Sequence, residues 1–184
     1  MTAMSPPSTT KLLIAVAFAA LLSGCIDSAA PILADAQPVL GPKLNLQLYT
    51  LRDGHASDPE RARFVWDGRR YARARGGMTD IAGFTLHPFE AGYFIVQSIS
   101  LRHPEHAEYA VMHPLADGVY FVNAIDEDDA DAATRAKLCE KTEKYSCRIS
   151  THEQLVAFAR ATVAKHQASG GLAIRLEAGA PKKR

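Results

Sequence analysis

Three histidines in one stretch of the chain are the side chains best suited to bind a metal ion. His103 and His106 are separated by two residues, one of them Glu105, and His113 follows seven residues later. Zinc takes three or four nitrogen, sulfur or oxygen ligands, which this set could supply. However, no cysteine accompanies them, and His103 and His113 each precede a proline, which favours extended backbone. We expect a solvated connection between strands, with a metal site at His103, His106 and His113 as the alternative.

The acidic run Asp126–Asp131 can be compared with a calcium-binding loop. Such a loop needs oxygen ligands at its first, third and fifth positions, followed by a glycine. Counting from Asp126 places Ala130 at the third ligand position and Asp131 where the glycine belongs. The run therefore indicates a solvated helix start, where the helix dipole favours acidic side chains.

Catalytic patterns are missing from the sequence. There is no Gly-x-Ser-x-Gly turn, and the pairs Gly76-Gly77 and Gly170-Gly171 lack the flanking residues of a phosphate-binding loop. Carboxylates such as Glu105 and Glu108 could act as acid and base only if the fold brought a pair together in a cleft. We therefore expect a protein without enzymatic activity and without a cofactor.

The segment Phe64–Tyr71 predicts a hairpin with an aromatic face. Asp67-Gly68 at its centre favours a two-residue turn, because both central positions of that turn need positive φ. In this register Trp66 faces Arg69, so that the guanidinium can lie against the indole ring. Such a face usually packs in a core, and the alternative is that Trp66, Arg69 and Tyr71 bind a ligand.

The first 25 residues have the organisation of an export signal. Lys11 precedes the apolar run Leu12–Leu22, which at 11 residues is far shorter than the roughly 20 of a membrane-spanning helix. The run ends in Leu22-Ser23-Gly24-Cys25, which resembles the lipobox of bacterial lipoproteins. The resemblance implies that Cys25 is acylated and becomes the first residue of the mature protein. The alternatives are an ordinary signal peptide with a chance cysteine and an uncleaved anchor.

The lipobox resemblance also implies a location. Ile26 follows Cys25 where inner-membrane lipoproteins of enterobacteria have an aspartate, which favours the outer membrane with the domain facing the periplasm. Export would bring Cys139 and Cys147 into an oxidising compartment, where a disulfide is expected. The bond closes a nine-residue loop and stabilises the fold by about 2 to 3 kcal/mol. A catalytic thiol is the alternative, but no activating base stands nearby.

Composition divides the chain into four parts. Residues 1–24 are the predicted signal peptide, and residues 25–43 are the lipidated cysteine and a proline-containing flexible tether of up to about 60 Å. Residues 44–178 form one predicted periplasmic domain, and residues 179–184 form a basic tail. The formal net charge of +1 argues against a nucleic-acid partner, which normally requires a basic face.

Alternating apolar residues predict that most of the domain is an antiparallel sheet. A second hairpin is expected around Asp117-Gly118, and a short helix over Asp131–Cys139. A capping box at Ser150–Glu153 starts a longer helix, and a last strand at Leu172–Leu176 returns to the sheet edge. The predicted class is α+β, with a strongly curved or barrel-like sheet of about seven strands, then two helices and a last short strand.

The sequence therefore predicts a membrane-anchored lipoprotein that acts as a non-enzymatic binding or accessory module for an envelope protein. One alternative is a domain that holds a small ligand or a metal inside its curved sheet. The less favoured alternative is a hydrolase. That alternative requires His87, His103, His106 or His113 to meet acidic side chains in one pocket.

Overall fold

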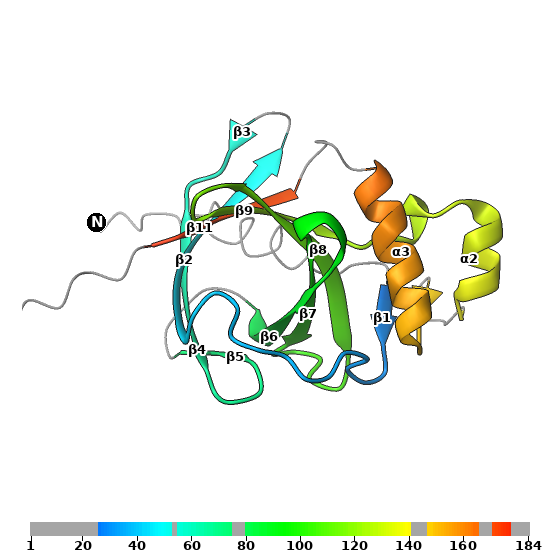
Figure 1. Cartoon of the computed structure of the whole chain (residues 1–184), viewed down its shortest axis with the longest axis horizontal. Helices are drawn as coiled ribbons and strands as arrows, with labels where there is room; N and C mark the ends of the chain where they lie inside the picture. The colour runs from blue at the N-terminus through cyan, green and yellow to red at the C-terminus, as the bar shows by residue number, and fades with distance from the viewer. Residues whose placement is uncertain (1–25, 53–54, 75–79, 141–146, 166–170, 178–184) are drawn as a thin grey trace, which may run out of the picture.

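A closed antiparallel β-barrel of eight strands forms the centre of the molecule, seen end-on in Figure 1. The structure is a computed structural model that describes residues 26–52, 55–74, 80–140, 147–165 and 171–177. The barrel strands are β2 (Lys43–Arg52), β4 (Glu60–Trp66), β5 (Tyr71–Arg73), β6 (Ile81–Pro88), β7 (Phe94–Ser100), β8 (Ala107–Ala116), β9 (Val119–Ala124) and β11 (Gly171–Leu176). Each strand pairs with the next along the chain, and β11 closes the barrel by pairing with both β9 and β2.

The remaining elements lie outside the barrel. They are β1 (Ile26–Ser28), β3 (His55–Ala56), η1 (Glu90–Gly92), η2 (Glu127–Asp129), α2 (Ala132–Leu138), β10 (Cys147–Arg148) and α3 (His152–Lys165). β1 pairs with the first residues of β8 and runs parallel to β10. In Figure 1, α3 stands beside the barrel with β1 between them, and α2 lies farther out. In the described part of the chain, no helix is long and apolar enough to cross a membrane.

The predicted curved, mainly antiparallel sheet with two helices is confirmed, and the sheet is closed. It has eleven strands in the described residues rather than about seven. The difference comes largely from β1, β3 and β10, which have two or three residues each and are too short to show a periodic pattern. The last strand, β11, lies between β2 and β9 instead of at a sheet edge.

The hairpin between β4 and β5 has a different register from the one predicted. Trp66 pairs with Tyr71, and Phe64 pairs with Arg73, so the loop contains four residues instead of two. The Asp67 carboxylate accepts hydrogen bonds from the backbone nitrogens of Arg69 and Arg70, at 2.9 Å each. This local capping favours the longer turn. Arg69 therefore lies in the turn and not opposite Trp66 in the sheet.

The second hairpin is confirmed, with β8 and β9 joined through Asp117-Gly118. Pro114 lies near the end of β8, beyond Met112, the last residue of β8 that pairs with β7. Proline has no backbone N–H to donate and is tolerated where a strand has a neighbour on only one side. A register shift between Pro114 and Ala116 follows it.

Both predicted helices are present, and both begin at side-chain caps. The Asp131 carboxylate accepts a hydrogen bond of 2.9 Å from the backbone nitrogen of Thr134 at the start of α2. At the start of α3, Thr151 and Gln154 cap each other's backbone nitrogens, at 3.2 and 2.9 Å. The capping box is therefore one residue later than the predicted Ser150–Glu153 box.

Residues 26–43 are part of the folded structure, although their composition predicts a flexible tether. Residues 26–28 form β1, and Lys43 begins β2. Residues 29–42, which we call the strap, follow the barrel surface between these strands, and their backbone nitrogens donate hydrogen bonds to three barrel side chains described below. The predicted signal peptide, Cys25 and the basic tail at 179–184 lie outside the described residues.

Two hydrophobic cores lie on opposite faces of the barrel wall. The inner core fills the barrel and contains Leu44, Leu46, Leu48, Ala62, Phe64, Tyr71, Leu86, Val96, Ala110, Met112, Val122 and Leu172. The outer core lies between the wall and α3 and contains Ile26, Ile95, Ala107, Tyr109, Val111, Ile125, Ala130, Cys147, Ile149, Leu155, Phe158 and Ala159. Strands β7 and β8 contribute alternate residues to both cores, as the period of two requires.

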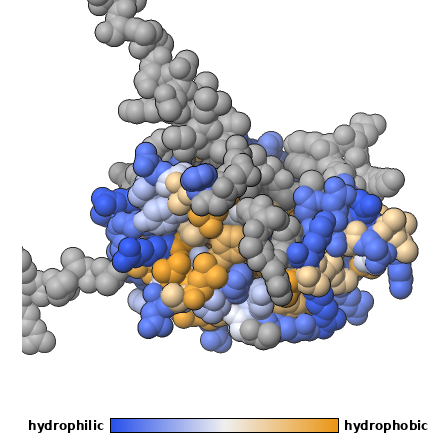
Figure 2. All heavy atoms as spheres, turned by 90° about the horizontal axis from the view of Figure 1, so that it is seen from above, coloured by the Kyte–Doolittle hydropathy of each residue, from blue (hydrophilic) through white to orange (hydrophobic). Residues whose placement is uncertain are grey.

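The outer core is closed at one edge by the predicted disulfide, which joins Cys139 to Cys147. Its sulfur atoms link the end of α2 to β10, so that α2 is covalently tied to the sheet. Hydrophilic side chains cover much of the surface in Figure 2, around an apolar area on the face shown.

Candidate ligand cavity in the barrel

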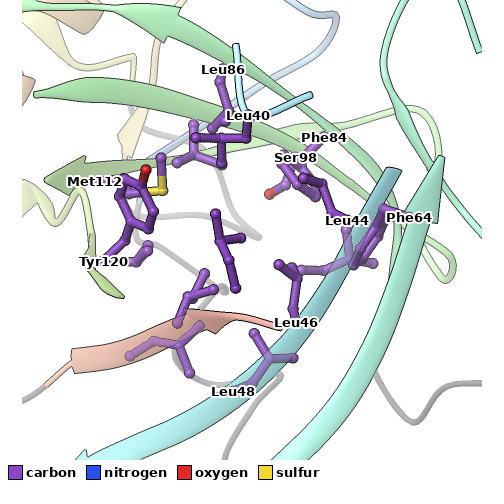
Figure 3. Close-up of a pocket in the computed structure, with 16 residues that line it drawn as sticks. Leu40, Leu44, Leu46, Leu48, Phe64, Phe84, Leu86, Ser98, Met112 and Tyr120 are labelled. Atoms are coloured by element: carbon purple, nitrogen blue, oxygen red, sulfur yellow. The ribbon is translucent and has the colours of Figure 1, made fainter. Parts of the chain in front are cut away.

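The inner core leaves a cavity of about 50 Å³ at the centre of the barrel. Figure 3 shows the side chains around it, among them Leu46 and Leu48 of β2 and Met112 of β8, pointing inward. Its wall is apolar throughout: the hydroxyl-bearing residues Ser98 and Tyr120 line it with their non-polar atoms. The lining residues are Leu40, Leu44, Leu46, Leu48, Phe64, Ile81, Phe84, Leu86, Val96, Ser98, Met112, Tyr120, Val122, Leu172, Ile174 and Leu176.

An apolar wall determines which occupant the cavity favours. A buried water needs two to four polar partners, and this wall offers none, whereas apolar cavities stay dry or take hydrocarbon groups. Barrels of eight strands either fill with side chains or hold one small ligand. This barrel lies between the two cases, because its side chains nearly fill it. Met112 and the leucines can change rotamer more easily than a wall of aromatic or β-branched residues.

The strap supplies one wall of the cavity through Leu40. Its backbone nitrogen donates a hydrogen bond of 3.1 Å to the hydroxyl of Tyr71. Farther back along the strap, Gln97 holds both the N–H and the C=O of Leu33, at 2.9 and 3.1 Å. The Tyr109 hydroxyl accepts from the nitrogen of Ile32 at 3.2 Å. The strap is therefore fastened by side chains rather than by strand pairing, and it carries a leucine into the inner core.

Tyr71 connects the aromatic side of the inner core to the strap. It is fully buried, with its ring stacked on Phe84 and the edge of Trp66 against it, at centroid distances of 5.0 and 5.2 Å. Burial raises the pKa of the Tyr71 hydroxyl, so it stays protonated. Trp66 and Tyr71, predicted as weak ligand-binding residues with Arg69, thus pack within the barrel, and Arg69 is exposed in the turn.

A carboxyl group stands at the rim of the barrel on β8. Glu108 follows the same alternation as Ala110 and Met112 and lies opposite Ser98 of β7. Burial, together with the nearby carboxylates of Asp80 and Asp27, raises the pKa of Glu108 to about 7. The group therefore exchanges its proton near neutral pH, next to the edge where β1 joins the sheet.

The predicted metal ligands lie in two places. His103 and His106 are close together, with ring centroids 6.4 Å apart, and Glu105 Oε1 lies 3.6 Å from the first and 3.5 Å from the second. His106 Nδ1 is also 3.0 Å from Asp27 Oδ2. His113 instead packs against the rings of Tyr93 and Phe121. The structure thus joins two of the three histidines and gives the third a separate, aromatic environment.

His87, the remaining histidine considered for hydrolysis, has its own surroundings, distinct from those of His103, His106 and His113. Its Nε2 lies 2.9 Å from the Thr85 hydroxyl, and burial lowers the ring's pKa, with a smaller contribution from His152. In the described residues, one group of three potential metal ligands has all its ligand atoms within 4.8 Å of one another, and it consists of Glu127 and the two disulfide cysteines, Cys139 and Cys147. Because those cysteines are bonded to each other, this group offers no thiolate to a metal.

No protein family, curated protein or solved structure matches the chain in the three comparisons. The site therefore has to be judged by its own chemistry. The cavity itself has no signature in the sequence. The alternating leucines of β2 and β11 predict an apolar face, but an unfilled space depends on how eight strands curve together.

Proposed function

We propose that this protein is a lipid-anchored, non-enzymatic binding protein that holds a hydrocarbon group in its barrel. The observation that supports the proposal is the apolar cavity of about 50 Å³ that the inner core lines. An apolar cavity of about 150 Å³ binds benzene in another protein, so a ring or chain would have to widen this one. Displacement of Leu40 and a new rotamer of Met112 are the smallest changes that would do so.

The proposed anchor is the acylated Cys25, and the proposed location is the outer membrane facing the periplasm. The lipobox at residues 22–25 supports both. Mass spectrometry of the protein extracted from a Gram-negative host should give residues 25–184 plus acyl groups, less two hydrogens for the disulfide. Cys25→Ser should give the uncleaved chain without acyl groups. A wild-type mass lacking acyl groups would overturn the anchor.

Binding of N-phenyl-1-naphthylamine, a neutral apolar fluorophore, tests the cavity. Val96 lines the cavity, and Val96→Phe should fill it and weaken probe binding at least tenfold. Val65 is 42% exposed on the outer face of β4, so Val65→Phe is the matched control and should bind like the wild type. Equal affinity in the two variants, or no binding to the wild type, would contradict the proposal. Circular dichroism should first establish that both variants are folded.

The same purification tests the envelope protein partner that the sequence leads us to expect. If the barrel ligand is the main function, an organic extract of the purified protein should contain a bound hydrocarbon compound. A second protein that remains bound in native mass spectrometry, with an empty extract, would favour the accessory-module alternative.

A further inference from the structure

The residues directly after the proposed lipid-bearing cysteine belong to the folded domain. Ile26, Asp27 and Ser28 form β1 and are 0%, 1% and 1% exposed. β1 has a neighbour on each side, since it pairs with β8 through Asp27 and Ser28 and with β10 through Ile26 and Asp27. A strand paired on both edges and buried along its length cannot act as a spacer.

Side chains also fix β1 in place. The buried carboxylate of Asp27 has its Oδ2 atom 3.2 Å from Arg148 Nη2 and 3.0 Å from His106 Nδ1. Next to it, the hydroxyls of Ser28 and Tyr109 are hydrogen-bonded at 2.6 Å. Burying a carboxylate is strongly unfavourable without such partners. Release of β1 would therefore break this ion-pair cluster and two sets of strand pairings together.

We infer that the acyl chains hold the domain directly against the lipid headgroups, with the edge where β1 begins facing the bilayer. The inference rests on the proposed acylation of Cys25. The Cα atoms of Cys25 and Ile26 are separated by one peptide unit, about 3.8 Å. A free segment of the same length as residues 26–43 would give the domain a reach of about 23 Å.

The membrane-facing edge is defined by two strands. β1 and β10 run parallel, and Ile26 is in register with Cys147, so both strands begin at the same edge. Cys147 is also fixed by its disulfide to Cys139. The point of attachment is thus tied to the outer core, and through Tyr109 and Gln97 of the barrel wall to the strap that carries Leu40.

Energy transfer from the single tryptophan, Trp66, to dansyl-labelled lipid headgroups measures this distance in liposomes carrying the full lipidated protein. The test variant has a flexible insert of 20 Gly and Ser residues between Cys25 and Ile26, led by an extra isoleucine so that the residue after Cys25 is unchanged. The matched control carries the same insert in the turn between Asp117 and Gly118. The anchor insert adds about 25 Å of reach and should lower the transfer at least twofold. The control insert should leave it unchanged.

Asp27→Asn provides a second test without an insertion, with the exposed Asp58→Asn as its control. Loss of the carboxylate's contacts with Arg148 and His106 should loosen β1, which its strand pairings still hold, and lower the transfer by less than the anchor insert does, while Asp58→Asn should leave it unchanged. Transfer that is insensitive to the anchor insert would overturn the inference, because the wild-type domain would then already be on a long tether. Failure of the proposed acylation is distinguishable, since the protein would neither show the acyl mass nor float with the liposomes.

Discussion

The inner and outer cores share the strands β7 and β8 but differ in how completely they are packed. Most members of the outer core are 0 to 1% exposed, whereas most members of the inner core are 2 to 9% exposed. The outer core lies between the barrel wall and α3, and no strand pairing fixes the spacing between them. The inner core is limited by the circumference of the barrel, which strand number and stagger determine. A helix on a sheet can thus fill its interface, while a closed barrel keeps whatever space its side chains leave.

Truncating one leucine of each core should give the largest loss in the free energy of unfolding, and the two losses should differ. Leu155 in α3 belongs to the outer core, and Leu46 in β2 lines the cavity. Leu155→Ala should lower the free energy of unfolding by about 4 kcal/mol and Leu46→Ala by about 2 to 3 kcal/mol. The cavity-lining leucine has fewer neighbouring atoms to lose. Urea unfolding of both variants measures the difference, and an equal or larger cost at Leu46 would break the comparison.

Removal of the disulfide should have the next largest effect on the free energy of unfolding. Replacing both Cys139 and Cys147 by serine should lower the free energy of unfolding by about 2 to 3 kcal/mol, because the unfolded chain regains the freedom of the closed loop. Since Cys147 lies within the outer core, exchange of the α3 amides should rise more than that of the β2 amides. Hydrogen exchange followed by mass spectrometry would show this, and equal changes in both elements would contradict the separation of the cores.

Replacing one valine of each core by isoleucine should change the stability in opposite directions. Val111 of β8 points into the outer core, and Val122 of β9 lines the cavity. Val111→Ile should destabilise the protein by about 1 to 2 kcal/mol, because a filled core has no room for another methylene. Val122→Ile should stabilise it by about 0.5 to 1 kcal/mol by filling space. Thermal unfolding of the pair decides the point, and stabilisation by both substitutions would mean that both cores are loosely packed.

The hydrogen bond between the strap and the barrel should have a smaller effect. Tyr71→Phe removes the hydroxyl that accepts from the Leu40 nitrogen and leaves the stacked ring in place. We expect a loss of about 1 kcal/mol in the free energy of unfolding. Faster hydrogen exchange at Leu40, without a change in α3, would assign the loss to the inner core. Unchanged exchange at Leu40 would show that the strap is held in other ways.

A further contrast concerns the pH dependence of stability, which Glu108 at the rim of the barrel should govern. Its pKa in the folded protein is about 7, above the ordinary value of 4.5. The folded state therefore keeps a proton that the unfolded state releases, and this contribution to stability is lost as pH rises from 4.5 through 7. Glu108→Gln should flatten the stability curve over that window. An unchanged slope in urea midpoints would exclude Glu108 as its source.

Local patterns in the sequence determined much of the secondary structure. The alternating leucines of β2 and β11, the Asp117-Gly118 turn and the caps at the starts of α2 and α3 all act within a few residues. The disulfide partners could also be named, because Cys139 and Cys147 are the two cysteines that remain once Cys25 is assigned to the predicted lipobox. The register of the first hairpin was missed because the Asp67 side chain stabilises a longer turn than the dipeptide suggests.

Only the tertiary structure decided that the sheet is closed, that β1 and the strap are bound, and that a cavity remains. Closure depends on pairing between β2 and β11, which are far apart in the sequence. The strap has three prolines and no periodicity, and distant side chains such as Gln97 and Tyr109 hold it. The cavity depends on barrel circumference and side-chain volume taken together. These features come from contacts between distant residues, which no short segment of the sequence encodes by itself.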